Sequence, residues 1–189
     1  MTLPLLLLAT LAALFSFLAP CLASTWLKTG KETSRPYGHV EYCSRNASDC
    51  RNRSAGSKLQ PARMDVLQGV NKAVNRAIKP TSDKAAFGRE EFWTADARAG
   101  DCEDFALAKR AKLLRKGFEP SQLLLTMGHN SAEPHAVLVV RTQDGDYVLD
   151  NLDDDVRPVQ SARMSFLKIQ SPEHGGLWLR VTGKTGQKP

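Results

Sequence analysis

The chain has 189 residues, of which 42% are hydrophobic and 24% charged, and this composition excludes a disordered chain and favours a single globular domain. Its 26 Lys and Arg against 20 Asp and Glu give a formal net charge of +6. A basic excess is common among nucleic-acid-binding proteins, but these basic residues are scattered and no nucleic-acid motif accompanies them. We therefore interpret most of the charge as solvated surface and expect no nucleic-acid partner.

The N-terminus is apolar from residue 3 to residue 19 and then ends in small residues, which predicts a secretory signal peptide over residues 1–23. No Lys or Arg precedes the apolar run, so an uncleaved anchor is the alternative, although the run is barely long enough to span a bilayer. A lipoprotein site at Cys21 is disfavoured because Pro20 precedes it. We expect a mature single domain of residues 24–189, periplasmic or secreted, without stable membrane insertion.

Removal of the signal peptide leaves three cysteines, Cys43, Cys50 and Cys102. Cys43 and Cys50 lie close together in a polar stretch, as the two ends of a small disulfide loop would in an oxidising compartment. A zinc-binding pair is the alternative, but no second pair of Cys or His follows at a suitable spacing. Cys102 is then the odd thiol, and such a thiol is either buried and inert or functional.

Residues 24–60 are polar and rich in turn formers, so we predict irregular structure there, held by the cysteine bridge. From Arg63 to Lys79 apolar residues recur at helical spacing, which predicts a helix that Pro80 ends. A loop-like connection follows. Its aromatic residues are interpreted as packing over the core, and they are Phe87, Phe92 and Trp93.

A second helix is predicted to begin with Asp101 as N-cap and Cys102 at the first helical position. Glu103 and Asp104 fill its first turn, where acids interact favourably with the helix dipole, and Gly117 is a suitable C-terminal stop. Its predicted buried stripe consists of Phe105, Ala108, Ala111 and Leu114.

The periodicity then changes to short runs rich in Leu and Val, at residues 121–128, 134–142 and 146–152. Asp144-Gly145 between the last two is typical of a hairpin turn. Weaker strand signals follow at 164–170 and 177–183. Helices followed by an antiparallel sheet predict an α+β fold.

The start of the second helix suggests a chemical role for Cys102. A helix N-terminus stabilises a thiolate, whereas the three adjacent acids disfavour it, so a nearby imidazolium or a bound cation has to compensate. His135 opens one strand after an expected flexible loop, and Asp150 ends the next strand. Cys102, His135 and Asp150 together could supply the nucleophile, the base and the orienting group of a hydrolase. A short hairpin turn sets Asp150 opposite Val137 or Val139, however, so contact with His135 needs a bulge, a twist or a diagonal approach.

The segments GDCED, HAVL and VLDNL occur in that order, at residues 100–104, 135–138 and 148–152. With the paired cysteines, they make the chain from about Tyr42 to Val159 resemble the bacterial transglutaminase-like cysteine proteinases. The resemblance implies a papain-like fold in its transglutaminase arrangement, with N-terminal helices packed on an antiparallel sheet. The best-understood relatives are periplasmic, calcium-dependent proteases that clip biofilm adhesins from the cell surface.

The resemblance also implies roles for individual residues. Cys102 becomes the nucleophile, His135 the general base and acid, and Asp150 the orienter. Asp101 and Glu103 become candidate calcium ligands, in keeping with the preference of Ca²⁺ for carboxylate oxygens. Their alternative role is only to cap the helix and favour its dipole, and the acidic run of residues 150–155 is interpreted as a solvated turn.

We therefore expect a cysteine peptidase that cleaves a protein substrate, needs no organic cofactor and has Ca²⁺ as its candidate metal. Transfer of the acyl group to an amine, as in a transglutaminase, is the alternative within enzymes, and a non-catalytic calcium-responsive binding module is the alternative outside them. The N–H of Cys102 is a plausible oxyanion donor. Sequence does not choose a second donor among Gln60, Gln122 and Trp93, nor does it identify a cell-surface substrate or a regulatory partner.

Overall fold

The computed structural model describes residues 24–186 apart from 52, 54–58 and 132. The predicted signal peptide of residues 1–23 lies outside the described residues. Within the described part of the chain, no helix has both the length and the apolar character needed to cross a membrane.

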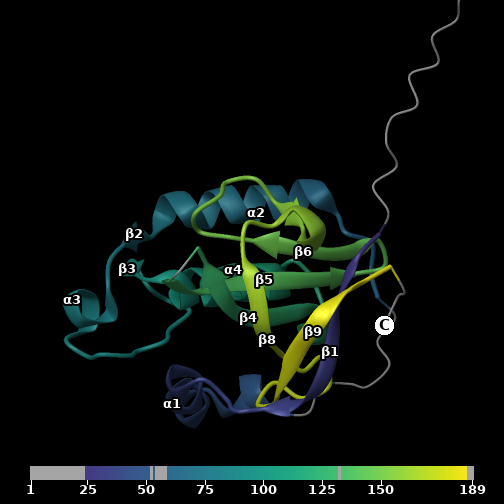
Figure 1. The fold of residues 1–189 in the computed structure, drawn as a ribbon. Coiled ribbons are helices and arrows are strands. Elements are labelled where there is room, and N and C mark those ends of the chain that lie inside the picture. The colour runs from purple at the N-terminus through teal and green to yellow at the C-terminus, as the bar shows by residue number, and fades with distance from the viewer. Residues whose placement is uncertain (1–23, 52, 54–58, 132, 187–189) are drawn as a thin grey trace, which may run out of the picture.

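A seven-stranded antiparallel sheet forms the centre of the molecule, in the strand order β1-β9-β8-β4-β5-β6-β7 (Figure 1). The sheet curls so that β1 and β6, which are not neighbours in this order, come into contact. The N–H of Leu27 in β1 donates to the side chain of Asp146 in β6. The strands are β1 (Trp26–Thr33), β4 (Leu123–Asn130), β5 (Glu133–Thr142), β6 (Gly145–Leu149), β7 (Arg157–Pro158), β8 (Ser165–Gln170) and β9 (Trp178–Thr185).

The described α-helices are α1 (Tyr37–Arg45), α2 (Met64–Ala77), α3 (Asp83–Phe87) and α4 (Cys102–Arg115). Short 3₁₀ turns lie at Ala47–Cys50, Pro120–Gln122 and Val159–Ser161, and β2 (Lys79–Pro80) pairs in parallel with β3 (Ala99–Gly100). The α4 helix packs on β5, and α2 packs on α4. The predicted α+β class, with helices on an antiparallel sheet, is confirmed.

Both faces of the sheet are covered by apolar side chains. One cluster joins the helices to the sheet through residues such as Phe105, Leu107 and Leu138, and a second lies around Val137 and Val139. The α4 helix is buried around most of its circumference, well beyond the predicted stripe, and even its Lys109 and Arg110 are buried. Its first turn, which carries Cys102, is thereby fixed against the sheet.

The expected irregular structure of residues 24–60 is wrong, because this segment contains β1 and α1. The strand β1 reads WLKTGKET and has only two buried apolar residues, Trp26 and Leu27. Its stability comes from pairing with β9, more than 140 residues later in the chain. A partner so distant leaves no local signal in the sequence.

Two smaller expectations also need correction. The segment before His135 is not a flexible loop, since β4 and β5 pair continuously out to Asn130 and Glu133. Among the aromatic residues of the connection 81–100, only Trp93 enters the core. Phe87 and Phe92 are half-buried and pack on each other, with ring centroids 4.9 Å apart.

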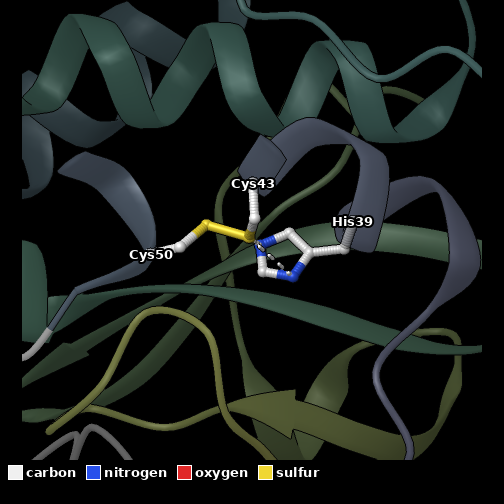
Figure 2. A group of neighbouring side chains, drawn as sticks. All are labelled: His39, Cys43 and Cys50. Atoms are coloured by element: carbon white, nitrogen blue, oxygen red, sulfur yellow. Dashed lines mark hydrogen bonds between the residues drawn. A yellow bond between two sulfur atoms is a disulfide. The ribbon is translucent and has the colours of Figure 1, made fainter. Parts of the chain in front are cut away.

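Cys43 in α1 is joined to Cys50 by a disulfide, which excludes the zinc-pair alternative in this oxidised state. The buried ring of His39 lies against the bridge (Figure 2), with its Nε2 3.7 Å from the Sγ of Cys43. Burial lowers the pKa of His39 to about 3, so the ring is neutral. Its Nδ1 accepts a hydrogen bond from the indole of Trp178 at 3.0 Å, and the bridge is therefore packed into the sheet.

Removal of the bridge is expected to destabilise the protein. In the double variant Cys43→Ser, Cys50→Ser, the free energy of unfolding should fall by about 2 kcal/mol, because the bridge closes a short loop in the unfolded chain. Urea unfolding monitored by tryptophan fluorescence measures the change, with Ser44→Ala in the same loop as the control. An unchanged unfolding midpoint would contradict a stabilising role.

Candidate active site

Cys102 is the first residue of α4 and is a free, partly exposed cysteine. Its Sγ donates to Oε2 of Glu103 at 2.9 Å and accepts the N–H of Ala136 at 3.3 Å. The thiol therefore lies against the first residues of β5, next to the backbone of His135. Among the hydrogen bonds of the described residues, none joins the thiol directly to the imidazole of His135.

The surroundings of the sulfur favour the protonated thiol. Burial raises the pKa of Cys102 well above its usual range, and Glu103 raises it further by its charge and by accepting the thiol hydrogen. The N–H of Ala136 lowers the pKa but does not outweigh these effects. The helix N-terminus alone does not activate this thiol, which agrees with the expectation that a base or a cation has to compensate.

His135 and Asp150 form a close pair. Nε2 of His135 lies 2.8 Å from Oδ1 of Asp150, which also accepts the N–H of Leu152 at 3.0 Å. Burial raises the pKa of Asp150, but the hydrogen bonds from His135 and Leu152, together with nearby positive charge, outweigh burial and hold the pKa below its usual value. The carboxylate is thus ionised at neutral pH and fixes one ring nitrogen, which leaves Nδ1 of His135 for other chemistry.

The strand register explains how the two residues meet. Leu138 pairs with Leu149 across β5 and β6, so Asp150, the next residue, lies opposite Val137. His135 is two residues from Val137 and therefore on the same face of the sheet. The contact is the diagonal approach, without a bulge between β5 and β6.

The acidic residues around Cys102 form a buried cluster that extends beyond the motif. Ligand atoms of Asp83, Asp101 and Glu103 all lie within 4.8 Å of one another. Asp101 occupies the N-cap position of α4, as predicted, but its side chain makes no capping hydrogen bond to the first turn. The Oδ1 atoms of Asp83 and Asp101 are buried and have no hydrogen-bond partner among the described residues.

Burial and mutual repulsion within this cluster disfavour the ionised carboxylates of Asp101 and Asp83 and raise their pKa values. Burial raises the pKa of Asp101, and the charges of Glu103 and Asp83 raise it further. The pKa of Asp83 is also raised, chiefly by burial. Like carboxylates in one site favour the uptake of protons or of a cation, and three oxygen ligands are the kind that a hard cation prefers.

Asp104 has a different part in the structure. Its Oδ1 accepts the N–H of Thr94 at 2.8 Å, which ties the loop before α4 to the helix. Burial is the main reason that its pKa is raised to about 7. Gly100 is required beside it, because a Cβ there would lie only 1.9 Å from Oδ2 of Asp104. The glycine and the last acid of GDCED are therefore explained by packing.

Asp83 was not predicted as a residue of this site. It is the first residue of the short helix α3, in a segment that we expected to be a loop-like connection. Its side chain accepts the N–H of Phe92, which folds the connection back toward α4. Asp101 lies eighteen positions after Asp83, and nothing in the local sequence indicates that the two meet.

Two of the three side chains considered as second oxyanion donors, those of Gln122 and Trp93, are engaged elsewhere. The side-chain amide of Gln122 donates to the backbone carbonyl oxygen of Arg141 at 3.1 Å, and the backbone carbonyl oxygen of Gln60 accepts the backbone N–H of Gln143. Both lie toward the end of β5 that is far from His135. The indole N–H of Trp93 donates to Glu91 at 3.0 Å.

Comparison with known proteins identifies the family of the chain and several similar solved structures. A model of the family described as bacterial transglutaminase-like cysteine proteinase BTLCP matches residues 29–186. A structure of Legionella pneumophila LapG is 25% identical, with a TM-score of 0.50 over 61% of this chain and 67% of that chain. The calcium-bound form is also 25% identical, with a TM-score of 0.51 over 65% and 71%. An EGTA-treated form is similar as well. No match was found among curated proteins.

Proposed function

The chain belongs to the bacterial transglutaminase-like cysteine proteinases and is therefore a cysteine peptidase, and we propose that it hydrolyses a protein amide bond with Cys102, His135 and Asp150 as its catalytic triad. The observation that carries this assignment is the 2.8 Å contact between His135 and Asp150. It is supported by the N–H of Ala136, directly after His135, which reaches the sulfur of Cys102. The nucleophile, base and orienting group thus converge from three elements.

In the proposed mechanism, His135 takes the thiol proton and the Sγ of Cys102 attacks the carbonyl carbon of the scissile amide. Asp150 holds the imidazole and stabilises the imidazolium as it forms. His135 then gives the proton to the leaving amine, which departs and leaves a thioester on Cys102. A water molecule deprotonated by His135 hydrolyses that thioester and restores the thiol. The backbone N–H of Cys102, at the start of α4, is available to stabilise the oxyanion.

The acidic cluster fits a calcium ion. Asp83, Asp101 and Glu103 offer three carboxylates in a small, largely buried space, and two of their oxygens have no hydrogen-bond partner in the part of the chain that the structure describes. One of the similar LapG structures is calcium-bound. We assign Asp101 and Glu103 as ligands, as the family resemblance implies, and add Asp83 from its position. A bound cation would supply positive charge beside the thiol and offset the carboxylates that raise its pKa.

The proposed setting is the periplasm or the cell exterior. The apolar leader of residues 1–23 supports export, and the disulfide between Cys43 and Cys50 is consistent with an oxidising compartment. A protein exposed at the cell surface is then the class of substrate that the enzyme would meet. Such a substrate is of the same class as the cell-surface adhesins that relatives in this family clip.

Comparative proteomics of the cell surface and medium tests this function. Cells that produce the wild-type enzyme are compared with cells that produce Cys102→Ser, and a fragment released only by the wild type is expected. An identical set of fragments would overturn the proposed hydrolysis. Incubation of the purified enzyme with the identified substrate and a labelled amine then separates hydrolysis from acyl transfer, because only transfer incorporates the label.

A further inference from the structure

A cavity of about 360 Å³ lies directly beside Asp150 and takes no part in the proposed mechanism. It is enclosed by the tip of the β4–β5 hairpin, at Asn130 and Ser131, and by the turn that follows β6. Asp150 connects the cavity to the active site, because its Oδ1 contacts His135 and the residue also lines the cavity. His135 gives its proton to the leaving amine, so a substrate that passes His135 reaches the cavity with residues C-terminal to the scissile bond.

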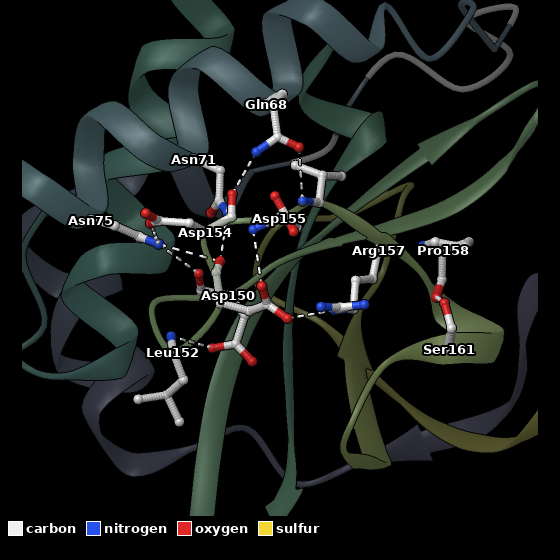
Figure 3. A network of polar contacts seen from close by, with 12 residues as sticks. Gln68, Asn71, Asn75, Asp150, Leu152, Asp154, Asp155, Arg157, Pro158 and Ser161 are labelled. Carbon is white, nitrogen blue, oxygen red and sulfur yellow. Dashed lines mark hydrogen bonds and ion pairs between the residues drawn. The ribbon is translucent and has the colours of Figure 1, made fainter.

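The turn after β6, which forms one wall of the cavity, is held in place by α2 (Figure 3). The Nδ2 of Asn75 donates to the carbonyl oxygen of Asp150 and to Oδ1 of Asp154, both at 3.0 Å. The side-chain amides of Asn71 and Gln68 donate to the carbonyl oxygen of Asp154. The acidic run, which we expected to be a solvated turn, is therefore clamped to α2, and this wall is formed before a substrate binds.

Apolar side chains make up part of the lining. Val148 is buried and Ala162 is half-buried, whereas Leu152, two residues after Asp150, is 63% exposed. Ligand sites commonly combine such apolar surface with a few polar groups that fix the orientation of the ligand. The apolar surface suits the aliphatic part of a bound side chain, and the charged part of the lining determines which side chain fits.

Each carboxylate of the lining already has a basic partner within the protein, and the pairs are Asp150 with His135, Asp153 with Arg157, and Asp155 with Lys72. Arg157 uses its Nε for this pair, and its terminal nitrogens donate to no described residue. The exposed guanidinium of Arg163 makes no ion pair and donates no hydrogen bond in the described part of the chain. Guanidinium groups with free donors match the geometry of a carboxylate.

We propose that this cavity is a substrate subsite for an acidic side chain, glutamate or aspartate, on the C-terminal side of the scissile bond. The substrate carboxylate pairs with Arg163 and with the terminal nitrogens of Arg157, and its methylene groups lie against Leu152 and Ala162. Arg163 is thus a specificity-determining residue that takes no part in bond cleavage. This inference rests on the proposed function, because it assumes that the substrate passes His135 on its way to the cavity.

Cleavage of a peptide library tests the subsite. Peptides from a digested bacterial proteome are incubated with the wild type, and mass spectrometry identifies the cleaved bonds, with acidic residues expected to be enriched at a position C-terminal to them. Of two synthetic peptides with Glu or Gln at that position, the Glu peptide should have a kcat/KM about tenfold higher, the effect of a charge-assisted hydrogen bond.

Substitutions of Arg163 assign this preference to the cavity. In Arg163→Gln the ratio of the two kcat/KM values should fall to about twofold or less, and Arg163→Glu should favour a Lys peptide over the Glu peptide. Arg180→Gln, at an exposed arginine of β9, is the matched control and should keep the wild-type ratio. Equal cleavage of the Glu and Gln peptides by the wild type would overturn the inference, as would an unchanged ratio in Arg163→Gln.

A binding measurement separates this inference from the proposed function. In Cys102→Ser, ¹H–¹⁵N NMR titration with millimolar N-acetylglutamate methylamide should shift the amide signals of Ser131 and Leu152. The N-acetylglutamine analogue should not shift them, and Arg163→Gln in the same background should abolish the response to glutamate. Equal responses to the two probes, or none to either, would refute the subsite. A wild-type protein that cleaves no peptide would refute the proposed hydrolysis, and the titration would still decide whether the cavity binds an acidic side chain.

Discussion

Substitution of His135 by alanine is expected to lower kcat/KM for peptide hydrolysis by about 10³-fold, the size of effect typical for loss of a general acid–base group. The reason lies in the state of the thiol. Burial and Glu103 hold the pKa of Cys102 above its usual value, so the sulfur cannot ionise at neutral pH without a base. Steady-state kinetics on a peptide from the natural cleavage site measure the loss.

The rate at which iodoacetamide alkylates Cys102 provides a second measurement that needs no substrate. It should also fall in His135→Ala, because the alkylating agent reacts with the thiolate. His129→Ala is the matched control, since His129 lies in the same hairpin and pairs with Pro134 instead of lying beside Asp150. Equal alkylation rates in the wild type and in His135→Ala would show that His135 is not the base.

The geometry of the active site shows which of its parts sequence can predict. The residue types of GDCED, HAVL and VLDNL predicted Cys102, His135 and Asp150 as one site, and the structure brings the last two into contact. The sequence pattern could not predict that His135 and Asp150 meet by a diagonal contact, because this contact depends on the register of β5 and β6. A hairpin turn predicts the pairing of strands, whereas the reach of two side chains depends on the three-dimensional sheet.

The parts missed by sequence analysis share one physical cause, the distance along the chain between partners. The strand β1 is stabilised by β9 at the other end of the domain. Asp83 approaches Asp101 only because α3 and the connection to α4 fold back. Lys109 looked like one more solvated charge on a helix, and only the packing of α2 and β5 around α4 shows that it is buried. Local periodicity cannot report any of these contacts.

Removal of calcium is expected to abolish most of the activity, and restoring it should recover the activity. With EGTA, kcat/KM should fall about 10²-fold. Without the cation, the negative charges of Glu103 and Asp101 are uncompensated and raise the pKa of the Cys102 thiol, and a rise of about two pKa units lowers the thiolate fraction about a hundredfold. Addition of Ca²⁺ in excess over EGTA should restore the rate. Asp83→Asn should weaken the calcium response, whereas Asp96→Asn, on an exposed loop nearby, should not.

The dependence of the melting temperature on pH provides a second test of calcium binding. The direction of the change with pH is set by the acidic cluster, and a non-specific effect of the chelator would not reproduce it. The pKa of Asp101 is raised in the folded protein by burial and by Glu103, and that of Asp104 is raised to about 7. A carboxyl group whose pKa is raised by folding binds its proton more tightly in the folded protein. It contributes its full stabilisation below its unfolded-state pKa, near 4, and this contribution is lost as the pH rises through its folded-state pKa. In EGTA the melting temperature should therefore fall between pH 5 and pH 8. With free Ca²⁺ at about 100 times its dissociation constant, the melting temperature at pH 8 should rise by about 5 °C or more, because the ion binds the folded state alone. A melting temperature that is equal with and without calcium at pH 8 would mean that this acidic cluster does not bind the ion.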